Sequence, residues 1–333
     1  MSGRCGGSDM EAQVLFAPME GLTDRVFRRV HHESFSGVDA YFTPFVSLTQ
    51  NLRFAPREAR DLSPEANRGV PCVPQVLTRN ADHFIWAAEQ FAEMGYTEIN
   101  LNAGCPSATV TAKRKGAGML TDPDALDAFL ESVCSRSPLP VSVKTRIGFA
   151  SPEEWPRLLK IYARYPLCRL IIHPRTCRDR YDPDRIHPDC WREACRSFPG
   201  VLVRNGDLFG TADALAAFSS GSSLMIGRGM LADPALAREI KGGKKLTREE
   251  LMAFHDRLTE ALSEVYPPDT VFMKLRVFMK HLECCFEPSP KLDRKIRKAR
   301  SLPELLEIDR ILFDTCSFLS DPVYIPDEKR GLP

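Results

Sequence analysis

Short apolar runs alternate with longer amphipathic segments through the first 230 residues of the chain. Eight of these runs are rich in β-branched and aromatic residues, a composition typical of strands. They begin at Val14, Ala40, Cys72, Glu98, Val141, Leu170, Val201 and Ser223. The segments between them, such as 81–95 and 123–133, space their apolar residues as helices do. Strand and helix therefore alternate at a repeat of roughly 30 residues, the length of one βα unit.

Eight such units within about 230 residues predict a closed (β/α)8 TIM barrel, an α/β fold. A doubly wound open sheet is the alternative, but no GxGxxG motif follows the first strand, where that fold places it. We assign residues 13–241 to the barrel and expect residues 1–12 to form a flexible leader.

The pattern changes after the barrel segment. Thr247 and Glu250 form a capping box ahead of an amphipathic helix, and Ser301 and Glu304 form a second one further on. A further helical stretch lies between them. We therefore expect residues 242–333 to form a small all-helical C-terminal domain.

Charge is balanced over the whole chain, with 45 Lys and Arg against 44 Asp and Glu, but not along it. Residues 241–300 contain 14 basic and 9 acidic side chains. Four of these basic residues share one face of a predicted helix, at positions i, i+3, i+4 and i+7. They are Lys291, Arg294, Lys295 and Lys298. Such a face is either simply solvated or contacts a nucleic-acid backbone.

The composition is that of a globular protein, with 43% hydrophobic and 27% charged residues. No apolar run approaches the length of a membrane span, and the N-terminus lacks the apolar segment of a signal peptide. We expect a cytoplasmic protein without a membrane partner. The eleven cysteines form no CxxC pair, which argues against a zinc ribbon or a disulfide framework, so we expect no metal.

Candidate site residues, most of them polar, follow seven of the eight predicted strands at their carboxyl ends, where TIM barrels carry their active sites. They are Pro18, Met19, Glu20, Gln75, Asn102, Lys144, His173, Arg175, Asn205, Gly206, Asp207, Gly227 and Arg228. The glycines after the seventh and eighth strands either make tight turns or expose N–H groups to a phosphate.

Two of the candidate residues suggest a chemistry. If the phosphate belongs to flavin mononucleotide (FMN), Lys144 would favour the anionic reduced ring, and Gln75 and His173 could bond the ring or the phosphate. Cys105 lies between Gly104 and Pro106 just past a strand, so it is not placed as an ordinary core cysteine. A thiol is mostly protonated at neutral pH, which favours a general acid over a nucleophile.

Eight segments, in order and spacing, make the chain resemble the tRNA-dihydrouridine synthase family of bacterial type over nearly its whole length. They are APMEGLTDRVFR from Ala17, PQVLTRN from Pro74, EINLNAGCPS from Glu98, KGAGML from Lys115, PVSVKTRIG from Pro140, IIHPRT from Ile172, VRNGDLF from Val203 and MIGRGML from Met225. The segment IHPRTCRDRYDP departs from the family pattern by a Pro and a Cys, and the loop that follows looks longer than usual.

The resemblance implies an FMN-binding barrel and a helical domain that binds tRNA. It implies FMN contacts at Pro18, Met19, Glu20, Gln75, Lys144, His173, Asn205, Gly206, Asp207, Gly227 and Arg228. In that family NADPH reduces FMN, hydride passes to C6 of an extruded uridine, and the thiol matching Cys105 protonates C5.

Other residues are implied in substrate binding. Asn102 would orient the uracil edge, and Arg175 is implied as a further substrate-binding residue. Two interpretations are open for the basic segment Lys113, Arg114 and Lys115. It either contacts RNA phosphate, as the basic face of residues 291–298 would, or forms an ordinary solvated loop.

Two alternatives stay open from the sequence. One is an FMN barrel that reduces a small pyrimidine or enone, as the dihydroorotate dehydrogenases do, and the other is a tRNA-binding protein without turnover. We expect a monomer, with either NADPH or NADH as the reductant.

Overall fold

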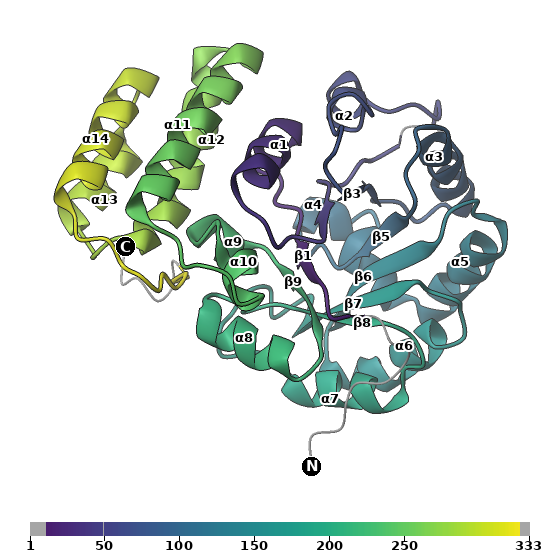
Figure 1. Ribbon diagram of the computed structural model, residues 1–333. Coiled ribbons are helices and arrows are strands. Elements are labelled where there is room, and N and C mark those ends of the chain that lie inside the picture. The colour runs from purple at the N-terminus through teal and green to yellow at the C-terminus, as the bar shows by residue number, and fades with distance from the viewer. Residues whose placement is uncertain (1–10, 49, 327–333) are drawn as a thin grey trace. The chain divides into compact units, whose positions relative to one another are not determined.

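The central feature of the computed structural model, which describes residues 11–48 and 50–326, is a parallel β-sheet (Figure 1). Its strands pair in the order β3-β2-β1-β9-β8-β7-β6-β5-β4. The two ends of this order, β3 and β4, are consecutive in the chain and separated only by Pro74. Pro74 has no N–H to donate, but its carbonyl accepts the Asn100 N–H at 2.9 Å. β3 and β4 thus act as one strand, and the predicted eight-stranded (β/α)8 barrel is confirmed.

Each of the eight predicted runs contains a strand. The strands are β1 (Val14–Phe16), β2 (Ala40–Phe42), β3 (Cys72–Val73), β4 (Gln75–Val76), β5 (Ile99–Ala103), β6 (Val141–Gly148), β7 (Arg169–Thr176), β8 (Leu202–Asn205) and β9 (Ser223–Ile226). Of the predicted leader, residues 1–10 lie outside the described residues.

Helices follow the strands as the βα repeat predicts, and α3, α5, α6 and α7 lie outside the ring of strands in Figure 1. The α-helices are α1 (Arg25–Ser34), α2 (Pro56–Asp61), α3 (Ala81–Glu93), α4 (Ala108–Thr111), α5 (Pro123–Arg136), α6 (Trp155–Tyr162), α7 (Pro188–Ser197), α8 (Thr211–Ser219), α9 (Arg228–Ala232), α10 (Leu236–Ile240), α11 (Arg248–Val265), α12 (Pro268–Leu282), α13 (Pro290–Lys298) and α14 (Leu302–Thr315).

The inside of the barrel is apolar at one end and polar at the other. Side chains two apart on a strand point to the same face, so Ile171 shares its face with His173, and Val203 shares its face with Asn205. The apolar members of these inward rows form one buried cluster. It comprises Leu15, Ala17, Ala40, Phe42, Val73, Ile171, Val203 and Met225. The polar members come later on each strand, at the carboxyl end of the barrel.

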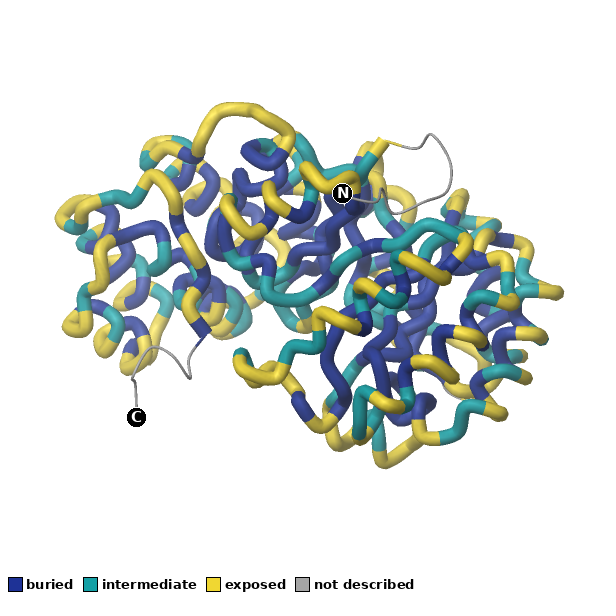
Figure 2. Tube along the Cα trace, turned by 90° about the horizontal axis from the view of Figure 1, so that it is seen from below, coloured by how far each residue is buried: buried dark blue, intermediate teal, exposed yellow. Residues whose placement is uncertain are grey.

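A second, larger apolar cluster lies between the outer face of the strands and the helices. Leu101 and Val143 belong to it, together with Phe84 of α3 and Trp155 of α6, all fully buried. In Figure 2 the buried stretches of the tube lie inward, and the exposed stretches lie on the outside, on helix turns as well as loops. Among the helices of residues 11–48 and 50–326, none has both the length and the apolar character needed to cross a membrane.

The described chain divides into two compact units. The first holds the residues to Pro18, Ala40–Asp207 and Phe218–Met225, and thus nearly all of the barrel sheet. The second holds Met19–Asp39, Leu208–Ala217 and the residues from Ile226 onward. Helices α11 to α14 therefore share a unit with α1, α9 and α10. The domain boundary at residue 242 stays a prediction.

One of the two predicted capping boxes is complete. The Thr247 hydroxyl accepts the Glu250 N–H, and Glu250 Oε2 accepts the Thr247 N–H, both at 3.2 Å. The capping box predicted at Ser301 is only partly correct, because one of its two hydrogen bonds goes to another residue. Ser301 Oγ caps α14 by accepting the Glu304 N–H, but Glu304 Oε2 accepts from Arg300 at 2.8 Å instead of from Ser301.

Asp24 links α1 to the C-terminal helices within the second unit. Its Oδ1 caps α1 by accepting the N–H groups of Val26 and Phe27, and its Oδ2 lies 2.7 Å from Lys274 Nζ and accepts the Tyr266 hydroxyl at 2.9 Å. Burial alone would raise the pKa of Asp24, but the Lys274 charge and these hydrogen bonds lower it below its ordinary 3.8. The buried pair joins segments 250 residues apart in sequence.

Asp24→Asn should destabilise the protein by about 3 kcal/mol at neutral pH, because removing one partner of a buried ion pair leaves the other charge uncompensated. Asn can still cap α1. Because the folded pKa of Asp24 is lowered, its contribution is present above the ordinary value of 3.8 and is lost as the pH falls through the folded value. Urea unfolding at pH 7 and at about pH 2 should therefore show a difference that shrinks in acid.

Glu33→Gln is the matched control, because it breaks the Arg257–Glu33 pair (2.8 Å) of the same unit, whose side chains are half exposed. That change should cost less than about 1 kcal/mol. An Asp24→Asn variant as stable as the Glu33→Gln variant would contradict the role given to the buried pair.

Candidate active site

Polar side chains from neighbouring strands meet at the carboxyl end of the first unit's barrel. Gln75 and Asn102 are buried there, as are His173 and Asn205, and Lys144 is partly buried. These are strand ends at which the sequence predicted functional residues. Because parallel strands of a barrel end at the same rim, the structure gathers them at one site.

Amide and hydroxyl side chains form a chain of hydrogen bonds across three strands. Asn100 donates to the Ser142 hydroxyl (2.8 Å), Gln75 Nε2 donates to Asn100 Oδ1 (2.7 Å), and Asn102 Nδ2 donates to Gln75 Oε1 (2.8 Å). Asn100 is not among the predicted site residues. Its position two residues before Asn102 could have revealed it, because both side chains then point into the barrel.

The Cys105 loop is held by the end of this chain. Asn102 Oδ1 accepts the N–H groups of Gly104 (3.1 Å) and Cys105 (2.9 Å), and the Cys105 carbonyl accepts the Ala117 N–H (3.0 Å). Gly116 has a positive φ of 56°, and a Cβ there would lie 2.9 Å from the Cys105 carbonyl oxygen. The backbone around a partly exposed thiol is thereby fixed.

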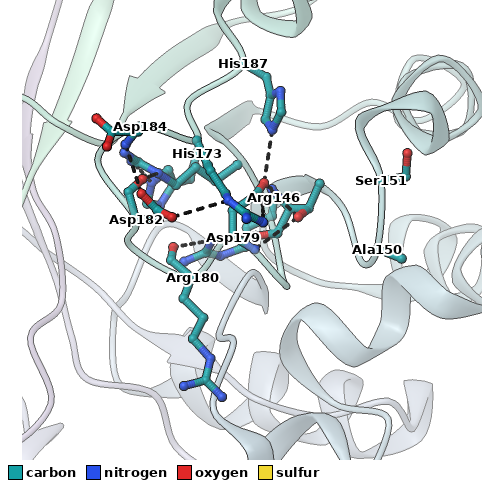
Figure 3. Close-up of polar contacts among 12 residues, drawn as sticks. Arg146, Ala150, Ser151, His173, Asp179, Arg180, Asp182, Asp184 and His187 are labelled. Atoms are coloured by element: carbon teal, nitrogen blue, oxygen red, sulfur yellow. Dashed lines mark hydrogen bonds and ion pairs between the residues drawn. The ribbon is translucent and has the colours of Figure 1, made fainter.

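Arg146 holds the same loop from the other side, by hydrogen bonds to backbone carbonyls (Figure 3). Its Nε donates to the Gly104 carbonyl (3.0 Å), and its Nη1 donates to the carbonyls of Thr176 (2.8 Å) and Arg180 (2.7 Å). Its guanidinium also lies over the Tyr181 ring, 5.1 Å from the centroid. The side chain is 1% exposed, and burial lowers its pKa. Arg146 thus ties the Cys105 loop to the end of β7.

His173 and Arg175, two apart on β7, lie against the turn after β8. Arg175 Nη1 is 3.2 Å from His173 Nε2, and because arginine can only donate, Nε2 accepts and the ring proton lies on Nδ1. Arg175 also pairs with Asp207. Gly206 has a φ of 98°, and a Cβ there would lie 2.5 Å from the His173 ring. The turn therefore requires glycine beside the histidine.

Arg175, predicted as a substrate contact, is fully buried. Its Nε donates to the Asp182 carbonyl at 2.9 Å, so each guanidinium nitrogen has a protein partner. In this arrangement it orders His173 and Asp207. Asn102 is similarly engaged with Gln75 and the Cys105 loop, and Asn205 donates to the Met225 carbonyl at 2.7 Å.

The loop after β7 closes around Asp179, as Figure 3 shows. Asp179 Oδ2 accepts the Thr176 N–H and hydroxyl, both at 2.7 Å, and lies 3.1 Å from His187 Nε2. The His187 N–H donates to the carbonyl of Pro174, the proline by which this segment departs from the family pattern. These bonds give the loop a defined shape beside His173.

Lys144 is a partly buried cation at the rim of the barrel. Within the described residues its Nζ makes no hydrogen bond and no ion pair. Burial and the nearby Arg146 charge lower the pKa of Lys144 to about 7. A lysine held in this way favours an anionic ligand, which would restore its charge.

A sequence profile of the dihydrouridine synthases (Dus) matches residues 15–303, most of the chain. The chain belongs to the dihydrouridine synthase family. The resemblance drawn from the motifs is thus confirmed, and the protein is an enzyme of the kind that forms dihydrouridine.

Curated members of the family align over most of their length. A tRNA-dihydrouridine(16) synthase of Neisseria meningitidis serogroup A is 27% identical over 320 residues, 90% of this chain and 94% of the relative. The enzyme of that name from Pseudomonas putida is 31% identical, over 74% of this chain and 78% of its own. A probable tRNA-dihydrouridine synthase of Staphylococcus aureus is 31% identical, over 87% of this chain and 90% of its own.

Four residues predicted to bind the cofactor of this dihydrouridine synthase lie in the second unit. Met19 opens a turn, with its carbonyl accepting the N–H groups of Leu22 and Thr23 at 3.0 Å. Glu20 belongs to the same turn. Gly227 and Arg228 lie where β9 gives way to α9, and both are partly buried. Pro18, at the end of the first unit's opening segment, is partly buried as well.

The basic residues predicted to meet RNA are on the surface. Lys113 and Arg114 are exposed and Lys115 is partly buried. Burial lowers the pKa of Lys115, and the charges of Lys113 and Arg79 lower it further. Arg79 was missed, although it lies in the PQVLTRN segment. The positive charges of Lys115, Lys113 and Arg79 repel one another, and a bound anion would stabilise them.

The basic face of the C-terminal helices forms as predicted. α13 buries Leu292 and Ile296 and exposes Lys291, Arg294, Lys295 and Lys298. Apolar and basic residues are thereby segregated on opposite sides of one helix.

The Lys144 ammonium should titrate about three units below ordinary lysines, since its pKa is lowered to about 7. NMR of reductively ¹³C-methylated protein, titrated from pH 6 to pH 11, would show one early resonance that is absent from Lys144→Met. A ligand that is anionic should move that titration upward. Lys144→Met should also raise the melting temperature of flavin-free protein at pH 6, because a buried charge is removed. A Lys144 resonance that titrates with the other lysines would contradict this environment.

Proposed function

We propose that this protein reduces uridine in tRNA to 5,6-dihydrouridine, with FMN as its bound cofactor and NADPH or NADH as the reductant. The observation that carries the proposal is the placement of Cys105. Asn102 and Arg146 fix the Cys105 loop at the barrel rim that also carries Lys144. Membership of the dihydrouridine synthase family and the tRNA named for its relatives support the substrate.

The residues of the first unit fit a flavin. Lys144 pairs with no anionic side chain of residues 11–48 and 50–326, and the Gly206 turn lies against the His173 ring where any side chain would collide. Lys144 would face the N1/O2 edge of the ring, and Gln75 and His173 would bond the ring or the phosphate. Pro18, Met19, Glu20, Asn205, Asp207, Gly227 and Arg228 complete the proposed FMN contacts. Bound FMN, once reduced, supplies hydride to C6 of the uracil.

Cys105 supplies the other half of the reaction. Saturating the C5=C6 bond takes one hydride and one proton, and the Cys105 thiol donates that proton to C5. The resulting thiolate recovers a proton from water, which the partial exposure of the side chain permits. Asn102 serves by fixing the backbone N–H of Cys105, so that the thiol keeps its direction while the pyrimidine binds. Arg175 orients His173 beside it.

The substrate base must leave its stack to reach Cys105, so the protein must bind the surrounding RNA by its backbone. Lys113, Arg114 and Lys115 follow the Cys105 loop directly and contribute phosphate contacts. Lys291, Arg294, Lys295 and Lys298 contribute others from α13. Because phosphate contacts carry no sequence information, they set the orientation of the tRNA and hence the uridine that is presented.

Purified protein with FMN, NADPH and tRNA from cells that lack dihydrouridine should form dihydrouridine, and mapping by position names the site. Position 16 is the first to inspect, because two of the relatives are named for it. Cys105→Ala should retain FMN and lower dihydrouridine formation at least about 100-fold, the usual contribution of a general acid. Cys72→Ala, another partly buried thiol of the same unit, is the control and should keep full activity.

Dihydrouridine formation that survives in Cys105→Ala would remove the general-acid assignment. NADPH oxidation through bound FMN without any change in tRNA would instead point to a small pyrimidine or enone as the substrate.

Charge removal on α13 should weaken tRNA binding without affecting the chemistry. Lys291→Gln with Lys295→Gln should raise the KM for tRNA several-fold and leave kcat within about twofold at saturating tRNA. The slope of log Kd against log salt should fall by about two, because two phosphate contacts are lost. Glu304→Gln with Glu307→Gln, on the next helix, provides a control of opposite charge that should not lower the slope. An unchanged KM would exclude α13 from the RNA interface.

A further inference from the structure

The chain after α14 returns across the second unit as a strap, here residues 317–326. It begins beside the end of α12, where Glu287 N–H donates to the Ser317 carbonyl and Leu319 N–H donates to the Cys285 carbonyl, both at 2.9 Å. It ends at the segment before α8, where Tyr324 N–H donates to the Phe209 carbonyl at 3.0 Å. Figure 1 shows this yellow segment leaving α14 and running toward α9 and α10.

Two contacts hold the strap between these ends. Asp321 accepts from Lys245 Nζ at 2.6 Å. Val323 packs against Gly210, where a Cβ would lie only 2.8 Å from Val323 Cγ2. Glycine at 210 therefore allows the strap to approach the backbone that precedes α8.

Arg228 lies against two aromatic rings at the end of this strap. Its guanidinium carbon is 4.9 Å from the centroid of Phe209 and 5.3 Å from that of Tyr324. Tyr324 is itself fixed, because it is 8% exposed and its ring stacks on His281 at 5.2 Å. The strap thus brings an ordered aromatic face to the first residue of α9.

Such packing limits the freedom of the arginine side chain. A guanidinium is attracted to the face of an aromatic ring, while its N–H groups lie in its own plane, where phosphate oxygens accept them. Arginine otherwise loses considerable rotamer freedom when it binds a ligand. Ordering the side chain beforehand lowers that loss and raises affinity.

We propose that Tyr324 is a positioning residue that holds Arg228 ready for the phosphate group of FMN. The inference rests on the proposed function, because it takes Arg228 as a phosphate contact. It assigns to the C-terminal strap a part in cofactor selection, since only flavins that carry a phosphate gain from an ordered Arg228.

Titration of flavin-free protein with FMN and with riboflavin, which lacks the phosphate, tests this by flavin fluorescence. Tyr324→Ala should weaken FMN binding about tenfold and change riboflavin binding less than about twofold. Tyr324→Phe retains the ring and should bind FMN within about twofold of wild type. In an Arg228→Ala background, Tyr324→Ala should have no further effect on FMN.

Val323→Ala is the matched control, because it shortens the neighbouring strap residue, which packs against Gly210, and it should keep the preference for FMN. If Tyr324→Ala is too unstable to titrate, Tyr324→Leu keeps the bulk without the aromatic face and should lose the same preference. An unchanged FMN affinity, or an equal loss for both flavins, overturns the positioning role alone. Wild-type protein that binds neither flavin overturns the proposed function, and the positioning role with it.

Discussion

The buried guanidinium of Arg146 is the interaction on which the active site most depends. It joins three segments by hydrogen bonds to the carbonyls of Gly104, Thr176 and Arg180. Hydrogen bonds that involve a charged group are worth roughly 1.5–3 kcal/mol each, and the buried charge would be costly without them. Removing the guanidinium would release the loop that carries Cys105 and the segment after β7 together.

The acceptors around Arg146 are neutral, and this choice shapes the electrostatics of the site. A carboxylate partner would cancel the arginine's charge, whereas carbonyl groups leave it in place. The uncancelled charge contributes to the lowered pKa of Lys144, after burial. The site is therefore positive before any ligand arrives, which suits a reduced flavin and RNA phosphates. Arg175 differs, because Asp207 compensates its charge.

The barrel could be predicted from the sequence because each of its strands shows a pattern within a few consecutive residues. Each strand is a short apolar run, and the residue that ends it on the inward row, such as Gln75 or Lys144, follows from a period of two. The partners of these residues could not be predicted in the same way. Asn100 bonds Gln75 because β4 and β5 pair with those two residues opposite each other, a register that no single strand encodes. Asn102, a predicted substrate contact, bonds Gln75 for the same reason. Arg175 instead finds its partners in His173 of its own strand, in the loop after β7 and in the turn after β8.

The aromatic core of the second unit was also beyond local patterns. Phe27 of α1 packs edge-on against Phe254 of α11 and Phe278 of α12, at 6.1 and 5.7 Å between centroids. The repeat assigned α1 to the barrel because it follows the first strand, as barrel helices do. The residues that bury α1 follow more than 220 residues later, so the sequence of α1 itself does not show where this helix packs.

That separation has a consequence for synthesis on the ribosome. Helix α1 emerges early, but the partners of Phe27 follow roughly 10–50 s later at ordinary translation rates. Residues 19–39 belong to the second unit, whose remaining residues are Leu208–Ala217 and those from Ile226 onward, so this unit cannot fold until late in synthesis. Until α11 and α12 have left the exit tunnel, the apolar side of α1 lacks these aromatic partners. The nascent chain should therefore engage general chaperones at α1, and truncated products should aggregate rather than accumulate as free barrels.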